Sequence, residues 1–248
     1  MVIIKIMSII YKSTSPMRNK KDLLFFSLAI PFLQTMFFLL IRRMYSSEFT
    51  LEEIILNNIL YAQYTQIIIN SAISVSRDRE IMSLRDIVLS KMGFIKISVI
   101  RTFLNSMVSF FFTALLILIF FIVFSLKITL NQIIFLTVTI LIAFSFLSLF
   151  SVFWGVIGMK YKETIFIVNV FLIIQLLISG INFPLGKLPS LFIIISRFMP
   201  LPYLIEAISA RAFNEQWYIS ISSLAALSIL FFIVSIMIFR LTKKLITT

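Results

Sequence analysis

Several chemically active residue types are missing from this sequence. It has no cysteine and no histidine among its 248 residues. The first absence excludes disulfide bonds and thiolate metal sites, and the second removes the commonest metal ligand and proton shuttle. Glycine and charge are scarce too, at 5 glycines and 13% charged residues. No phosphate-binding loop of the form G-x-x-x-x-G-K-[ST] is present, so we expect no metal, no cofactor and no catalytic site in this chain.

What the sequence has in abundance is apolar residues. They make up 60% of the chain and include 28 phenylalanines, more than a soluble core can bury. Apolar runs of about 20 residues are typical of membrane-spanning helices. We therefore predict an all-α membrane protein, multi-pass in the cell membrane, forming one transmembrane domain over residues 1–248. Six spans are predicted, at Leu23–Ile41, Ile54–Val75, Ile97–Leu126, Ile133–Ile157, Thr164–Phe183 and Ile219–Phe239.

The distribution of basic residues predicts the orientation. With both termini in the cytoplasm, sixteen of the 22 Lys and Arg residues fall inside and six outside. The ten acidic residues divide evenly, five on each side. Such a cation-specific bias follows the positive-inside rule, and it explains the net charge of +12 better than nucleic-acid binding does.

The N-terminal residues 1–21 form a separate segment. Lys5, Ser8 and Lys12 fall on one helical face and isoleucines occupy the others, which favours a helix lying in the membrane interface. Lys5 interrupts the apolar run and no small-residue cleavage site follows, so we do not expect a cleaved signal peptide.

One stretch, residues 76–92, carries charges of both signs between two apolar spans. As a helix it would place Ile81, Leu84 and Val88 on one face and Arg79 and Asp86 on the other. A lipid-binding helix would be mainly basic, whereas this mixture favours docking to another protein. A solvated loop helix with internal ion pairs is the simpler alternative.

Ionisable residues are almost absent from the span interiors, which argues against ion-coupled transport. Arg101, near the inner end of the third span, is expected to extend its side chain to the interface. Polar residues at helical spacing are either interhelical hydrogen-bonding groups or the lining of a substrate path. The candidates for that path are Gln63, Gln66, Asn70, Gln175, Ser179 and Asn182.

Prolines gather in the region 184–217, before the last span. Four of the six fall there, at Pro184, Pro189, Pro200 and Pro202, so no straight span can run through it. The segments between them are apolar. We therefore predict short re-entrant or interfacial helices at the outer side rather than a plain extracellular loop.

Two motifs, one in the charged stretch 76–92 and one in the proline-rich region 184–217, resemble those of the permease subunits of type-2 ATP-binding-cassette exporters. The first is Arg77-Asp78-Arg79-Glu80 with Ser83-Leu84, although Met82 stands where the family usually has glycine and Arg85 where it has glutamate. The second is an ordered series before the last span: Gly180, Phe183-Pro184, Leu188-Pro189, Ile195-Ser196, Pro200-Leu201, Tyr203, Glu206-Ala207 and Arg211. With the six spans and the N-terminal helix, the resemblance covers essentially the whole chain.

This resemblance implies a half-transporter. Two permease chains, identical or homologous, would form the pathway with two separate ATPase subunits that bind ATP and Mg²⁺. The ATPase-coupling residues would be Arg77, Asp78, Arg79, Glu80, Ser83, Leu84, Arg85 and Asp86, with a smaller contact at Lys160, Lys162 and Glu163. An extracellular gate would comprise Phe183, Pro184, Pro189, Pro200, Tyr203 and Glu206. The uncharged, aromatic-rich spans favour a hydrophobic or amphipathic cargo such as a drug, an antimicrobial peptide or a lipid-like molecule, and the composition suits a bacterium.

Three other functions stay open on the sequence alone. One is a membrane immunity or sensor protein that binds a toxin or a kinase without transport. Another is the permease of a lipid-linked glycan exporter. The third is an ion-coupled carrier, which would need ionisable groups in mid-membrane.

Overall fold

The long apolar runs form helices, as predicted. The computed structural model describes residues 25–44, 50–80, 84–90, 92–126, 129–161, 163–181 and 185–247, and these contain no β-strand. The predicted interfacial helix at residues 1–21 lies outside the described residues.

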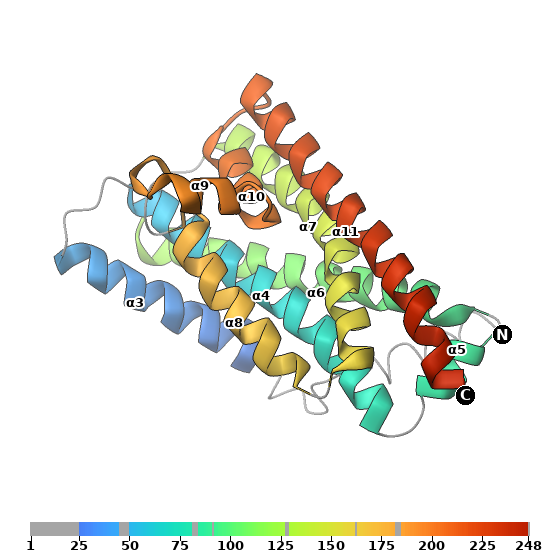
Figure 1. Ribbon diagram of the computed structural model, residues 1–248. Helices are drawn as coiled ribbons and strands as arrows, with labels where there is room; N and C mark the ends of the chain where they lie inside the picture. The colour runs from blue at the N-terminus through green and yellow to red at the C-terminus, as the bar shows by residue number, and fades with distance from the viewer. Residues whose placement is uncertain are drawn as a thin grey trace.

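The elements are the π-helix η1 (Phe25–Ala29), α3 (Ile30–Met44), α4 (Leu51–Glu80), α5 (Leu84–Leu89), α6 (Gly93–Val123), α7 (Leu130–Lys160), α8 (Thr164–Ile178), the 3-10 helix η2 (Leu185–Lys187), α9 (Ser190–Ser196), α10 (Pro200–Ser209) and α11 (Glu215–Thr247) (Figure 1).

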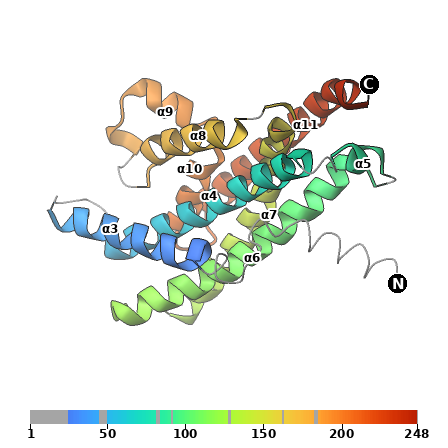
Figure 2. The same cartoon turned by 90° about the horizontal axis from the view of Figure 1, so that it is seen from below.

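Helix α4 is the central helix of the bundle. It contacts α3, α6, α7 and α8, and Figure 2 shows it between α8 on one side and α6 on the other. Its polar side chains bond to these neighbours: the Tyr61 hydroxyl donates to the Leu172 carbonyl at 2.9 Å, and the Ser71 hydroxyl donates to the Ser151 carbonyl at 2.6 Å. Because neighbouring helices satisfy and cover these groups, α4 can be the most polar of the long helices and still lie in the core.

A helix lies at each of the six predicted span positions, but not all of these helices are long and apolar enough to be recognised as membrane-spanning from length and composition. Among the described residues, α6, α7 and the Glu215–Thr242 part of α11 can each cross a membrane by length and composition, and the α9–α10 pair would raise that number to four. The apolar helices Ser27–Ile41 and Thr164–Ile178 are shorter, and α4 is long enough but too polar. The chain is therefore a membrane protein with several apolar helices, and the six-span topology with cytoplasmic termini stays a prediction.

Two glycines allow α4 and α7 to pack closely. A Cβ atom on Gly155 would lie 3.1 Å from the Ser71 hydroxyl oxygen, and one on Gly158 would lie 3.2 Å from the Ala72 carbonyl oxygen. Small residues at helix contacts let the two backbones approach, which is the usual basis of tight packing in membranes. The contact lies at the end of the bundle where α4 finishes, α5 follows and α7 finishes; we call it the α5 end.

The opposite end, which we call the α10 end, carries the proline-rich region. Helices α9 and α10 meet there at an angle of 91° across a short break. Pro189 precedes the first turn of α9, and Pro200 occupies the first turn of α10, where its missing N–H costs nothing. The predicted short, proline-broken helices are thus present, and their depth in the membrane stays a prediction.

Candidate functional site

The predicted coupling stretch begins inside the central helix. We predicted that a span ends at Val75 and a separate helix begins at Ser76, but α4 continues without interruption to Glu80. Arg77–Glu80 therefore form its last turn. Because they belong to the same helix as the buried core residues, a displacement at this turn is transmitted along the whole of α4.

Asp78, one of the predicted coupling residues, is buried. Its carboxylate pairs with the Arg101 guanidinium of α6, and the two residues are only 4% and 3% exposed. Arg101, which we expected to extend to the interface, is likewise buried. Burial raises the pKa of Asp78, which lies beyond the predicted span, and the positive charge of Arg101 opposes that shift. A buried carboxylate needs such a partner, because an unpaired charge in this environment is costly.

Arg79 joins the end of α4 to the end of α7. One nitrogen of its guanidinium donates to the Gly158 carbonyl at 3.1 Å and to the Tyr161 carbonyl at 2.7 Å. These carbonyls belong to the C-terminal turn of α7, whose backbone acceptors have no partner within the helix. A cation at this position also interacts favourably with the helix dipole. The last turn of α4 is therefore bonded to both α6 and α7.

Helix α5 exposes charges and buries apolar side chains. Leu84 and Val88 are buried in a cluster with Val75, Phe94 and Met159, as the predicted face requires. Arg85 and Asp86 are exposed, as is Glu80 at the end of α4, while Arg77 is half-buried. Ser83, the remaining residue of this group, lies outside the described residues.

The smaller predicted contact lies at the same end of the bundle. Lys160 and Glu163 are exposed, and the Lys160 ammonium lies 5.3 Å from the centroid of the Tyr161 ring. Because Arg79 bonds to the Tyr161 carbonyl, this segment adjoins the last turn of α4. Lys162 lies outside the described residues.

The five candidate path residues that the structure describes do not share one surface. Gln63 is buried and donates to the Ser27 carbonyl of η1 at 3.0 Å, which is the interhelical role. Gln175 and Ser179 are buried on the other side, where Gln175 faces Tyr64. Asn182 lies outside the described residues.

Among the described candidates, Gln66 and Asn70 keep partial exposure. Together with Ile73 and Arg77 they form a stripe at helical spacing on α4, and all four are half-buried. We call these four residues the α4 stripe. It leads from the middle of the central helix to its charged last turn.

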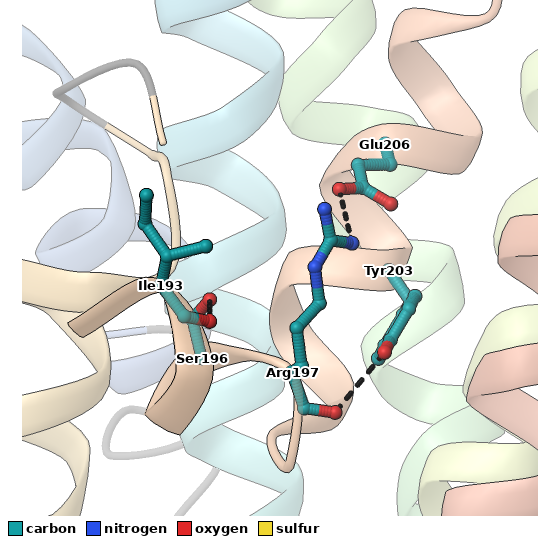
Figure 3. A network of polar contacts seen from close by, with 5 residues as sticks. All are labelled: Ile193, Ser196, Arg197, Tyr203 and Glu206. Carbon is teal, nitrogen blue, oxygen red and sulfur yellow. Dashed lines mark hydrogen bonds and ion pairs between the residues drawn. The ribbon is translucent and has the colours of Figure 1, made fainter. Parts of the chain in front are cut away.

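At the α10 end, the bend between α9 and α10 is held by polar contacts (Figure 3). The Arg197 guanidinium donates to the Glu206 carboxylate at 2.8 Å, and the Tyr203 hydroxyl donates to the Arg197 carbonyl at 3.0 Å. The guanidinium also lies 5.8 Å from the centroid of the Tyr203 ring. Of the predicted gate, Tyr203, Glu206 and Pro200 lie at this bend, and Pro189 lies at the other end of α9. Phe183 and Pro184 lie outside the described residues.

Sequence reasoning missed the Arg197–Glu206 pair and two further ion pairs of the described residues. The Asp78–Arg101 pair had a usable signal, because an arginine set eight residues into an apolar helix requires an acidic partner. The second pair, between the Arg211 guanidinium and the Glu53 carboxylate at 3.1 Å, joins residues far apart in the chain. No local pattern marks that pair.

With this geometry described, comparison with known families becomes informative. The family model for the ABC-2 type transporter matches residues 5–214, most of the chain. The chain therefore belongs to the ABC-2 type transporter family and is the membrane permease component of an ABC transporter. Permeases of this family generally work with ATPase subunits. The comparison with curated proteins gives no match.

Proposed function

We propose that this chain is the transmembrane subunit of an ATP-driven exporter for hydrophobic or amphipathic molecules, powered by separate ATPase subunits. The observation that carries the proposal is the attachment of α5 to the central helix. Exposed charges on α5 lie next to a turn of α4 that is bonded to α6 through Asp78 and to α7 through Arg79. A force applied to α5 thus reaches three of the long helices at once.

The coupling step follows from this attachment. An ATPase subunit docks on Arg85, Asp86 and Glu80, with Lys160 and Glu163 as a second contact. When two ATPase subunits close on ATP, they push the α5 end and rotate the bundle between inward-facing and outward-facing states as a rigid body. The exposed bend at the α10 end opens in the outward-facing state.

The α4 stripe supports a pathway between two permease chains. Gln66 and Asn70 are polar, partly exposed groups on a largely buried helix. Two copies of the chain would enclose them in a path with apolar walls and a few amide groups. Such a lining suits an amphipathic or hydrophobic cargo, because ligand sites of this kind are largely apolar with few polar contacts.

The test exchanges the two exposed charges of α5. The double variant Arg85→Glu, Asp86→Arg keeps the net charge of the chain. It places each of the two side chains opposite a like charge of the ATPase subunit, and each such like-charge contact costs several kcal/mol. We expect the ATP hydrolysis that depends on the permease to fall by about tenfold or more, since about 1.4 kcal/mol corresponds to a factor of ten. The measurement uses the co-purified complex in lipid vesicles.

The matched control is Lys96→Glu, which reverses an exposed charge on α6 near the same end. It should leave coupled hydrolysis within about twofold, as expected of an exposed residue away from the docking surface. Unchanged hydrolysis in the double variant would refute the docking role of α5. If no ATPase subunit co-purifies with the unaltered chain, the immunity or sensor function replaces the exporter.

A further inference from the structure

An apolar groove runs between α6 and α7 on the side of the molecule that would face lipid. Its cavity volume is about 460 Å³, within the range of about 300–1,000 Å³ for small-molecule sites. Phe110, Ala114, Leu118 and Ile122 line it from α6, and Ile133 and Ile140 line it from α7. From Phe110 to Ile122 the groove follows α6 for about 18 Å at 1.5 Å per residue. That length is close to half of the bilayer hydrocarbon core, which is about 30 Å thick.

A small charged pocket continues this groove at the α10 end. It shares Phe121 and Leu136 with the groove, so the two cavities are contiguous. Glu52, Glu53 and Arg211 line it. Its volume is about 40 Å³, which holds a group the size of a few water molecules at about 10–15 Å³ each.

The charged groups of this pocket differ in how many of their hydrogen-bonding atoms already have partners. Glu53 uses both carboxylate oxygens, accepting from the Thr50 backbone N–H at 2.8 Å and from the Arg211 guanidinium at 3.1 Å. Glu52 is half-buried, and among the described residues no cation forms an ion pair with it. Arg211 keeps further N–H donors beyond the one bonded to Glu53, because a guanidinium has five. The pocket therefore offers one carboxylate to a cation and one guanidinium to an anion.

We propose that the groove and the pocket together bind one membrane phospholipid with a primary-ammonium headgroup, such as phosphatidylethanolamine. An acyl chain lies along α6 and α7, the phosphate meets Arg211, and the ammonium meets Glu52. This arrangement matches the direction of a lipid in a leaflet, because the polar pocket lies where the two helices end and the groove extends away from it. The site is separate from the α4 stripe, so it does not depend on the proposed transport function.

Charge and size select among headgroups. An anionic glycerol headgroup would bring a phosphate to Arg211 but would offer no cation to the Glu52 carboxylate. A choline headgroup has the required charges, yet its quaternary ammonium carries three methyl groups and no N–H to donate to the Glu52 carboxylate. The primary ammonium is compact and donates three hydrogen bonds, as a lysine ammonium does.

The experiment is native mass spectrometry of the purified full-length chain released from detergent. The protein is incubated with ethanolamine, choline or glycerol phospholipids that carry identical acyl chains. We expect the ethanolamine lipid to give at least about fivefold more singly bound protein than either of the others, which corresponds to about 1 kcal/mol. Glu52→Gln should reduce that preference to less than about twofold without changing the folded mass distribution.

A groove-filling variant tests the acyl-chain part. Ala114→Trp places a large ring in the groove and should reduce ethanolamine-lipid binding about fivefold. The matched control is Leu115→Trp, which alters the next residue of α6; Leu115 is also exposed but does not line the groove. Its binding should equal that of the unaltered chain.

Three outcomes would overturn the proposal. Equal binding of the three lipids would refute headgroup recognition by the pocket. Unchanged lipid binding in Ala114→Trp would show that the chain does not lie in the groove. Loss of a dimeric mass in Ala114→Trp, with no loss of bound lipid, would identify the groove as a contact between two copies of the protein.

Discussion

The two ends of the molecule hold their charged side chains in different ways. At the α5 end, Asp78 and Arg101 pair out of contact with solvent, each with a side chain no more than 6% exposed. At the α10 end, the side chains of Arg197 and Glu206 are 48% and 26% exposed, and those of Arg211 and Glu53 are 51% and 27% exposed. The same kind of interaction therefore occurs in two different dielectric environments.

This difference gives the two ends different mechanical properties. Breaking a buried pair leaves an uncompensated charge and costs about 3–5 kcal/mol, whereas an exposed pair contributes about 0.2–1 kcal/mol. The α5 end is thus held firmly together, and the contacts at the α10 end can exchange with water at little cost. This distribution is consistent with the proposed coupling, in which force enters at the α5 end and the α10 end opens.

The largest effect is expected from removing the cation of the buried pair. Arg101→Met leaves the Asp78 carboxylate buried without its partner and should lower the free energy of unfolding by about 3–5 kcal/mol. Adding Asp78→Ala to the same chain removes the orphaned charge and should recover most of that loss. Reversible unfolding in mixed micelles, followed by tryptophan fluorescence, measures both. A loss below about 1 kcal/mol for Arg101→Met would show that the buried pair contributes no more to stability than an exposed pair. The two ends of the molecule would then not differ in this respect.

An intermediate effect is expected from glycine substitution. Gly158→Ala brings a Cβ atom to 3.2 Å from the Ala72 carbonyl oxygen, so α4 and α7 must move apart. Such overpacking should lower the free energy of unfolding by about 1–3 kcal/mol. The matched variant is Gly186→Ala at the α10 end, where a Cβ atom meets no neighbour within 4 Å. It should change stability by less than about 0.5 kcal/mol. Equal effects at the two positions would show that close helix packing is not confined to the α5 end.

The smallest effect is expected from the exposed pair at the bend. Arg197→Ala should lower the free energy of unfolding by about 0.2–1 kcal/mol at low salt. The loss should disappear near 1 M salt, where the screening length falls to about 3 Å. Arg101→Met serves as the comparison, because burial protects its pair from screening. A salt-independent loss in Arg197→Ala would mean that the bend is held by packing rather than by charge.

Local patterns in the sequence predicted much of the candidate site. Pro189 and Pro200 begin the two short helices as proline placement requires. The spacing of Leu84 and Val88 identified the buried face of α5, and Asp86 is exposed as expected. The order of motifs predicted the family that the comparison then showed. These features depend on residues a few positions apart, where backbone geometry alone sets which side chains share a face.

Other features could not be predicted because they depend on contacts between distant helices. The half-buried Gln66 and the fully buried Gln63 have the same chemistry and lie on one helix. Gln63 donates to the Ser27 carbonyl of η1, 36 residues away in the chain, and no local pattern shows that contact. The continuation of α4 beyond Val75 was missed since charged residues normally mark the end of a span. Here Arg101 and the last carbonyls of α7 receive those charges and keep the helix intact.

The sequence by itself determined that the chain is helical, apolar enough for a membrane, broken by proline before its last helix and related to ABC-2 type transporters. Composition and local order suffice for those conclusions, because they reflect transfer free energies and backbone restrictions of individual residues. Only the tertiary structure decided that the most polar long helix lies at the centre, and that Asp78 faces Arg101 rather than the solvent. The physical reason is that the environment of a charge is set by the helices packed around it, and that environment decides whether the charge is a docking contact or part of the core.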